Sequence, residues 1–152
     1  MEVGLSPKQL VCALAAQKAC EVAALDVSQG KAVLGSDTVV VYGGEVLGKP
    51  KDEADARRML TMLSGKTHQV YTGVCIVLPS GEKIVDADCT EVEFETLSTE
   101  KIEAYILSGS PMDKAGAYGI QDGGIVKEIR GSYSNVVGLP CEMLERMLKS
   151  IK

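Results

Sequence analysis

Residues 35–50 are GSDTVVVYGGEVLGKP, an apolar, β-branched run that ends in two glycines and is followed by a shorter apolar run. This pattern predicts a β-hairpin whose turn is Gly43-Gly44, because glycine readily adopts the positive φ angles that tight hairpin turns need. A two-residue turn would place Tyr42 opposite Glu45. We expect the rest of the chain to be organised around this hairpin.

One charged residue stands at the root of the hairpin. Asp37 opens a run that is otherwise typical of a buried strand, and an ionised carboxylate there is costly unless a cation, a metal or hydrogen-bond donors meet it. Counting back from the turn brings Lys49 opposite Thr38 and next to Asp37. Because a bulge at Gly48 would turn Lys49 to the other face, the prediction is one of proximity and not of orientation.

The composition is that of one globular domain, since 45% of the 152 residues are hydrophobic and 24% are charged. We therefore expect a single domain over residues 1–152. A net charge of −5 argues against a nucleic-acid partner, whose binding surface would be basic. No apolar run approaches the roughly 18 residues of a membrane span and no signal sequence is recognised, so we expect no membrane association and a cytoplasmic location.

Five cysteines are scattered along the chain, and none forms a C-x-x-C pair. An odd number without paired spacing predicts neither a disulfide framework nor a zinc site. We expect free, buried thiols at Cys12, Cys20, Cys75, Cys89 and Cys141.

The remaining elements follow from capping residues, turns and hydrophobic periodicity. Helices are expected at 7–25, 53–63, 99–107 and from 140 to the end of the chain, and strands at 69–78, 83–85, 90–97 and 125–129. In the strand at 90–97, Glu91, Glu93 and Glu95 alternate with apolar residues and predict a solvated face. Helices that alternate with hairpins and single strands indicate an α/β domain with a mixed sheet, not a doubly wound parallel one.

The first helix carries a lysine within its apolar stripe. Lys18 falls between Leu14 and Val22 with a spacing of four residues on each side. Either its stem packs on the core while the ammonium reaches water, or the ammonium is directed into a polar cleft. The predicted stripe is Leu10, Val11, Leu14, Val22 and Leu25.

A glycine-rich loop is predicted at residues 112–124. Such a loop lets backbone N–H groups approach a ligand, and Lys114 and Gln121 would add side-chain donors. A plain connection is the alternative. The lone His68 precedes a strand and is expected to be a hydrogen-bonding structural residue, with ligand contact as the alternative.

Together these side chains suit a polyanion with a bound divalent cation. Lysines neutralise phosphate oxygens, while a carboxylate holds a metal or accepts a proton from attacking water. The candidates are one carboxylate, three lysines and one amide: Asp37, Lys18, Lys49, Lys114 and Gln121.

Five ordered motifs resemble those of the Maf family of nucleoside triphosphate pyrophosphatases. They are GSDTVV at 35–40, LGKP at 47–50, LSGKTHQVYTGV at 63–74, MDKAGAYGIQ at 112–121 and GSYSNVVGLP at 131–140. The resemblance implies a fold similar to the inosine-triphosphate pyrophosphatases, an elongated α/β domain with a nucleotide cleft between two lobes, often dimeric. It also implies hydrolysis between the α and β phosphates, which releases a nucleoside monophosphate and pyrophosphate with a divalent cation such as Mg²⁺ or Mn²⁺.

The same resemblance assigns roles to single residues. Asp37 matches the family's proton acceptor, which also reaches the metal, and Lys18 matches a phosphate-binding lysine. Lys49 matches the lysine of the Gly-Lys-Pro motif. Thr38 and Gln121 match positions that set base preference. These are threonine and glutamine in the subfamily acting on dTTP and UTP and differ in the 7-methyl-GTP subfamily, so the chain resembles the former.

The sequence departs from the family before its first helix. Family members begin with a strand, a Ser-x-Ser-Pro-Arg-Arg loop and a helix, and a later glutamate contributes to the metal site, whereas the sequence from Met1 shows none of these. We expect an N-terminally shortened domain, in which an exposed strand edge would invite aggregation or pairing with another chain. Either the true start lies upstream, or the chain is a fragment or a decayed copy.

The leading hypothesis is a nucleoside triphosphate pyrophosphatase that acts on dTTP and UTP, with a homodimer as the expected assembly. One alternative is a catalytically impaired nucleotide-binding or interaction protein, because the amino-terminal phosphate loop is missing. The other is a pyrophosphatase of the same fold that acts on modified purine nucleotides. Product analysis across nucleotides separates these alternatives.

Overall fold

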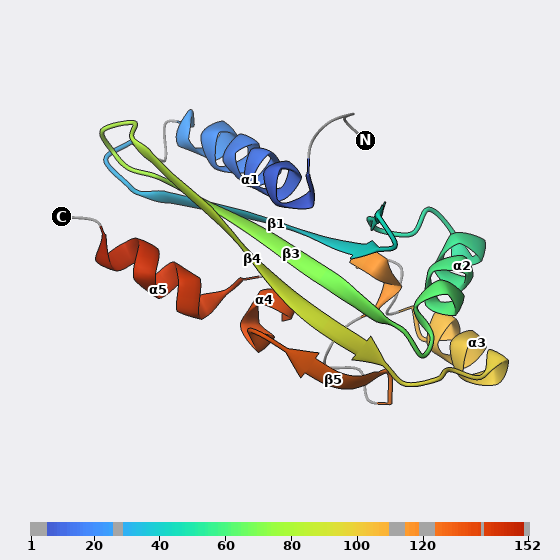
Figure 1. Ribbon diagram of the computed structural model, residues 1–152. Helices are drawn as coiled ribbons and strands as arrows, with labels where there is room; N and C mark the ends of the chain where they lie inside the picture. Colours follow the sequence, from blue (N-terminus) through green and yellow to red (C-terminus); the bar gives the residue numbers. More distant parts are fainter. Residues whose placement is uncertain (1–5, 26–28, 110–114, 119–123, 138, 151–152) are drawn as a thin grey trace. The chain divides into compact units, whose positions relative to one another are not determined.

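The computed structural model describes residues 6–25, 29–109, 115–118, 124–137 and 139–150 (Figure 1). No described helix is long and apolar enough to span a membrane. The strands form one sheet in the order β2-β1-β3-β4-β5. The described elements are α1 (Pro7–Ala23), β1 (Val33–Tyr42), β2 (Glu45–Leu47), α2 (Glu53–Leu63), β3 (Thr67–Val77), β4 (Lys83–Phe94), α3 (Thr99–Leu107), the 3-10 turn η3 (Ala115–Ala117), β5 (Val126–Arg130), α4 (Tyr133–Val137) and α5 (Cys141–Lys149).

The predicted hairpin is confirmed. Strands β1 and β2 pair antiparallel, with Tyr42 opposite Glu45. Gly43 and Gly44 have φ angles of 57° and 83°. Positive φ at both central residues is the backbone of a turn whose twist matches that of the flanking strands, which explains the need for two glycines.

Strand β2 is shorter than expected. Its last pair joins Leu47 to Val40, and the next carbonyl, that of Gly48, accepts a hydrogen bond of 3.0 Å from the N–H of Gly116. Strand β2 and its ladder with β1 thus end at Leu47, before Lys49. The register is the predicted one as far as Leu47, and the place of Lys49 beside Thr38 stays a prediction because Lys49 lies beyond the paired residues.

The predicted α/β class is confirmed, but the described strands form an antiparallel sheet and not the expected mixed one. Short turns reverse the chain direction between β1 and β2 and between β3 and β4. In the second turn, the N–H of Leu78 donates to the carbonyl of Glu82 over 2.8 Å.

Two predicted strands, 83–85 and 90–97, are one continuous strand, β4. The polar residues between them do not interrupt it. The carboxylates of Asp86 and Asp88 accept hydrogen bonds from the next N–H groups, over 2.8 and 2.9 Å. This local bonding leaves the backbone extended, so a polar segment remains part of the strand.

The chain forms two compact units. The first consists of Met1–Thr38, Tyr71–Cys89 and Ser134–Lys152, and the second of Val39–Val70 and Thr90–Tyr133. Strands β1, β3 and β4 each contribute residues to both units.

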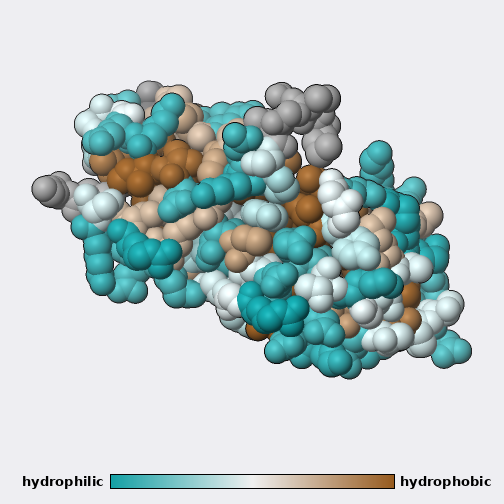
Figure 2. Space-filling view, in the orientation of Figure 1, coloured by the Kyte–Doolittle hydropathy of each residue, from teal (hydrophilic) through white to brown (hydrophobic). Residues whose placement is uncertain are grey.

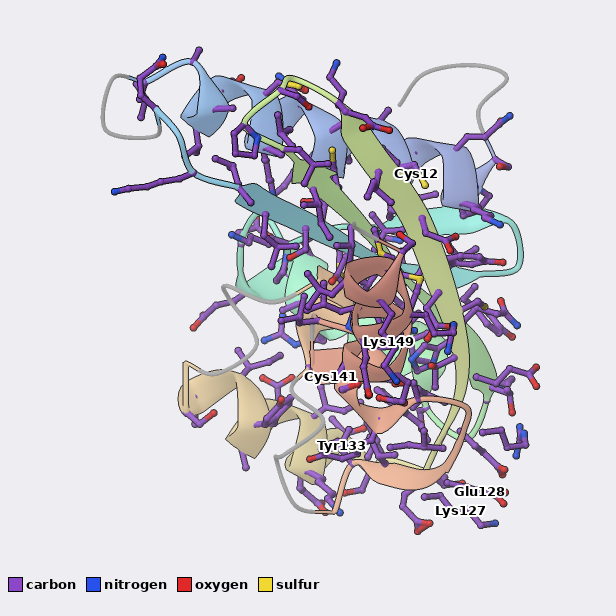
Figure 3. All side chains as sticks on the ribbon, turned by 90° about the vertical axis from the view of Figure 1, so that its left-hand side faces the viewer. Cys12, Lys127, Glu128, Tyr133, Cys141 and Lys149 are labelled. Atoms are coloured by element: carbon purple, nitrogen blue, oxygen red, sulfur yellow. The ribbon has the colours of Figure 1, made fainter. Side chains whose placement is uncertain are left out.

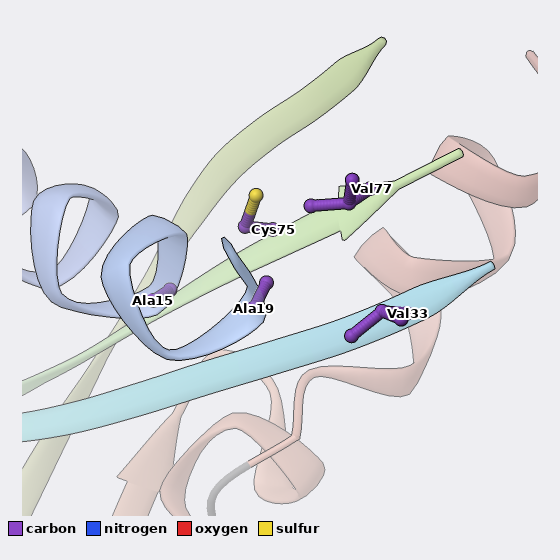
Figure 4. Packing of buried hydrophobic residues seen from close by; sticks show 5 residues of the cluster. All are labelled: Ala15, Ala19, Val33, Cys75 and Val77. Carbon is purple, nitrogen blue, oxygen red and sulfur yellow. The ribbon is translucent and has the colours of Figure 1, made fainter. Parts of the chain in front are cut away.

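In the first unit, α1 and α5 cover opposite faces of β3 (Figure 1). Alternate residues of a strand point to opposite faces, and β3 is apolar on both. On one face Cys75 and Val77 pack with Ala15, Ala19 and Val33, all of which Figure 4 shows. On the other face lie Val74, Ile76, Met143 and Met147.

Helix α1 begins as expected but buries another face. Ser6 caps it, and its side chain and backbone exchange hydrogen bonds with Gln9 in a capping box. The predicted stripe is wrong beyond Val11. Val22 and Leu25 are 47% and 52% exposed, and Figure 2 shows hydrophobic surface where β1 begins beside the turn between β3 and β4. The buried residues of α1 are Val11, Ala15 and Ala19.

Two glycines of the sheet explain this choice of face. A Cβ on Gly35 would lie 2.7 Å from the carbonyl oxygen of Ala15, and a Cβ on Gly73 would lie 2.3 Å from that of Val11. The helix backbone therefore touches the strand backbones directly. Only small residues fit at the contact, so Ala15 and Ala19 are buried in place of the large side chains.

The second unit contains α2, which forms at the predicted residues 53–63. The side chain of Asp52 accepts a hydrogen bond of 2.8 Å from the N–H of Asp55. Arg57 and Arg58 form exposed ion pairs, for example with Glu103 and Glu45. The buried residues of α2 are Ala56, Met59, Leu60 and Leu63.

The solvated face of β4 is confirmed within the second unit. Glu93 forms ion pairs with Lys127 and Arg130 of the edge strand β5, while Val92 and Phe94 are buried. Lys127 and its neighbour Glu128 project away from the ribbon of β5 (Figure 3). Charged side chains on an edge strand discourage pairing with another sheet.

Three smaller expectations need correction. Residues 133–137 form the short helix α4, which the sequence did not predict. Helix α5 ends at Lys149 and buries Met143 and Met147, whereas Leu148 is 52% exposed. All five cysteines lie among the described residues as thiols, without a disulfide bond. Two of them, Cys89 and Cys141, are exposed and not buried.

Candidate functional site

The centre of the candidate site is an ion pair within the first unit. The ammonium of Lys18 on α1 donates to Oδ1 of Asp37 on β1, and it also lies 3.4 Å from the carbonyl oxygen of Ser36. The Asp37 side chain is 18% exposed and that of Lys18 is 56% exposed. Lys18 is thus directed toward a carboxylate of the sheet, while the polar cleft of the second interpretation stays a prediction.

The close packing of α1 positions this pair. Ala15 and Ala19 lie against Gly35, which precedes Asp37 by two residues on β1. Lys18 lies between the two alanines in the sequence, and the short distance from helix to strand lets its ammonium reach the carboxylate. Gly35, Ala15 and Ala19 therefore position the ion pair of Lys18 and Asp37, although they take no part in it.

Next to Asp37, the hydroxyl of Thr38 takes part in a chain of hydrogen bonds. Its Oγ1 lies 2.8 Å from Oγ1 of Thr72 on β3. The Thr72 hydroxyl donates in turn to the backbone carbonyl of Asn135 on α4, over 2.9 Å. Thr72 and Asn135 are buried. Both residues lie within the motifs at 63–74 and 131–140, which indicated no role for them. The signal in the sequence is the polar Thr72 between Val70 and Val74 in an apolar strand.

The structure does not test the predicted roles of the other site residues. Lys49 is exposed, follows the end of β2 and belongs to the second unit. Its approach to Asp37 stays a prediction. Gln121 and Lys114 lie outside the described residues.

His68 has the structural hydrogen bond expected of it. The side chain is buried within the second unit, and its Nε2 lies 2.8 Å from the Tyr118 hydroxyl. The rings of His68 and Phe94 meet edge to face at 4.9 Å. Burial lowers the pKa of His68 to about 4, so the ring is neutral at pH 7. Burial also raises the pKa of Tyr118.

Asp37 is the residue on which the fit of a divalent metal ion to this site depends. Within the described ranges, no group of three or more histidine, cysteine, aspartate or glutamate side chains converges. Magnesium does not require one, because it is commonly held by one or two carboxylates together with substrate phosphates and water. With Lys18 on Oδ1, Asp37 retains Oδ2 as a ligand, so its carboxylate fits this mode of binding.

The fold and the site define an α/β domain with a lysine–aspartate pair where a helix meets the sheet. The chain belongs to the Maf family, because the model of that family, described as Maf-like protein, matches residues 2–151. The resemblance inferred from the five motifs is thereby confirmed.

Similar curated proteins carry one name, dTTP/UTP pyrophosphatase. The chain is 49% identical over 146 residues to that of Bacillus cereus (strain AH187). It is 51% identical over 147 residues to those of Bacillus cytotoxicus and Bacillus mycoides. In each comparison the match covers 95% of this chain and 75% of the relative.

Proposed function

We propose that this protein hydrolyses dTTP and UTP to the nucleoside monophosphate and pyrophosphate. It is a nucleoside triphosphate pyrophosphatase, and so a hydrolase, as its family and its relatives indicate. The observation that carries the proposal is the ion pair of Lys18 and Asp37. It places a carboxylate that can take a proton beside an ammonium that can neutralise a phosphate.

Asp37 accepts the proton of the water that attacks the triphosphate. One of its oxygens receives the Lys18 ammonium, which leaves the other for the water or for a metal ion. Lys18 is more than half exposed, so its ammonium can turn from the carboxylate to a phosphate oxygen when substrate arrives. A carboxylate released in this way is a stronger base than one held in an ion pair.

A divalent cation, Mg²⁺ or Mn²⁺, is the proposed cofactor, with Asp37 as its protein ligand. When bound, the cation would neutralise charge that develops on the phosphate oxygens. Lys49 is the second proposed phosphate-binding lysine, and Thr38 and Gln121 are the proposed contacts to the base. The motif matches support these three roles.

Three further properties, the fold, the assembly and the cellular location, are proposed from the family resemblance and the composition. The domain has the fold of the inosine-triphosphate pyrophosphatases, it assembles as a homodimer, and it works in the cytoplasm. Light scattering of the purified chain tests the homodimer directly.

The test of the function is product analysis with dTTP, UTP, 7-methyl-GTP and ITP in the presence of Mg²⁺ or Mn²⁺. We expect monophosphate and pyrophosphate from dTTP and UTP, and loss of this activity in Asp37→Asn, which keeps the size of the side chain. Asp88→Asn is the matched control, because Asp88 is also a half-buried aspartate on a strand. A folded wild type that is inert on all four nucleotides would refute the proposal and favour a nucleotide-binding or interaction protein.

A further inference from the structure

A chain of two hydroxyl groups ends at a backbone carbonyl inside the first unit. It starts at Thr38, which neighbours the Asp37 carboxylate, passes through Thr72 on β3 and ends at the carbonyl of Asn135 on α4. The distances between the linked oxygens are 2.8 and 2.9 Å. Thr72 and Asn135 are fully buried, while Thr38 is half-buried. These hydrogen bonds thus connect the buried interior of the first unit with the candidate site.

The positions of the hydroxyl protons follow from the carbonyl. A carbonyl oxygen only accepts, and a hydroxyl has a single proton. The hydrogen bond to Asn135 therefore uses the proton of Thr72. Thr72 can then bond to Thr38 only as an acceptor, so the proton of Thr38 lies between the two threonines.

We propose that Thr72 and Asn135 fix the Thr38 hydroxyl as an acceptor toward the ligand, and that this selects uracil and thymine over cytosine. The inference rests on the proposed function in one respect, that Thr38 faces the base. Uracil and thymine carry a proton on ring nitrogen N3, which Thr38 accepts. Cytosine carries a lone pair there, which would oppose a lone pair of Thr38.

The strength of the selection against cytosine follows from the Thr38 hydroxyl, which would have no hydrogen-bond partner on that base. A site built to bond a substrate N–H discriminates strongly against an analogue that lacks it, because its own polar groups lose their partner. In this site the hydroxyl cannot rotate to donate instead, since its proton is held by Thr72. Thr72 is a positioning residue that acts on the base through Thr38.

The experiment compares binding of the α,β-methylene analogues of UTP and CTP by calorimetry, so that no turnover is needed. We expect the wild type to bind the UTP analogue at least about 10-fold more tightly. Thr72→Val keeps the shape of the side chain but frees the Thr38 proton to meet cytosine, so the preference should fall to about 2-fold or less. Thr72→Ser keeps the hydroxyl and should keep the preference.

Thr90→Val is the matched control. Thr90 is also a buried threonine on a strand, and its hydroxyl donates to a backbone carbonyl, that of Ser132, over 3.0 Å. It belongs to the second unit. The same atoms are therefore removed in both variants, with a similar expected loss of stability. Only Thr72→Val should change the preference between the two analogues.

The outcomes separate this inference from the proposed function. Equal binding of both analogues by the wild type, no binding of either, or an unchanged preference in folded Thr72→Val overturns the inference. If Thr72→Val does not fold, Thr38→Val decides: it must weaken binding of the UTP analogue selectively, and equal weakening of both refutes the inference. A wild type that prefers the UTP analogue but does not hydrolyse UTP supports the inference and refutes the proposed function.

Discussion

Replacement of Gly73 by alanine should separate α1 from the sheet. The added Cβ would lie 2.3 Å from the carbonyl oxygen of Val11, 2.5 Å from its carbonyl carbon and 2.8 Å from the nitrogen of Cys12. These are backbone atoms, which cannot rotate away as a side chain can. The helix must therefore shift until the shortest contact reaches about 3 Å, the limit of real Cβ contacts.

The expected cost is at the upper end of that for an overpacked core, about 3 kcal/mol or more. For a domain of this size, that lowers the melting temperature by roughly 6–12 °C. The shift also loosens the contact of Ala15 and Ala19 with β1, which positions Lys18. Activity on UTP should therefore fall more than the remaining folded fraction explains.

The assay is urea unfolding followed by circular dichroism, together with pyrophosphate release at a temperature where the variant is folded. Gly48→Ala is the control, because a Cβ there meets nothing within 4 Å and its φ angle is not positive. It should change stability by less than about 0.5 kcal/mol. A Gly73→Ala variant as stable as Gly48→Ala would refute the direct backbone contact of α1 with β3.

Three further results are expected. The pKa of His68 is lowered by burial to about 4 from an ordinary 6.5, so the unfolded chain binds the extra proton between these values. Stability should fall by on the order of 3 kcal/mol as the pH drops through this window, and urea titrations at several pH values should show a smaller slope for His68→Gln. Ser6→Ala and Asp52→Ala should each lower the free energy of unfolding by about 1 kcal/mol through loss of a helix cap. If either is neutral in urea titration, that cap is not formed. Lys18→Met should reduce kcat/KM for UTP at least about 10-fold while Lys8→Met on the same helix leaves it unchanged; equal values would remove Lys18 from the site.

The hairpin and the helix caps could be predicted because their physics is local. Gly43-Gly44 specify a turn with positive φ whatever surrounds it, and the observed angles of 57° and 83° agree. Ser6 and Asp52 each satisfy N–H groups only three residues away. Such bonds depend on spacing along the chain, so the printed sequence suffices to find them.

The charged pair could be predicted in part. The motifs indicated Asp37 and Lys18, but spacing alone could not show that they meet, since 19 residues separate them in the sequence. Thr72 and Asn135 received no role, because a buried threonine in an apolar strand does not reveal which carbonyl it will find. Hydrogen bonds between distant residues depend on how strands and helices pack.

The buried face of α1 shows the same division. Neighbouring residues in the sequence were enough to predict that the segment is a helix and that it starts after Ser6. Hydrophobic spacing favoured Leu14, Val22 and Leu25, yet the helix buries alanines instead. Gly73, some sixty positions along the chain, lets the two backbones touch, and close packing then admits only small side chains on that side. A contact of this kind exists only once the helix lies on the sheet, which is why packing, and not periodicity, chose the face that carries Lys18 to Asp37.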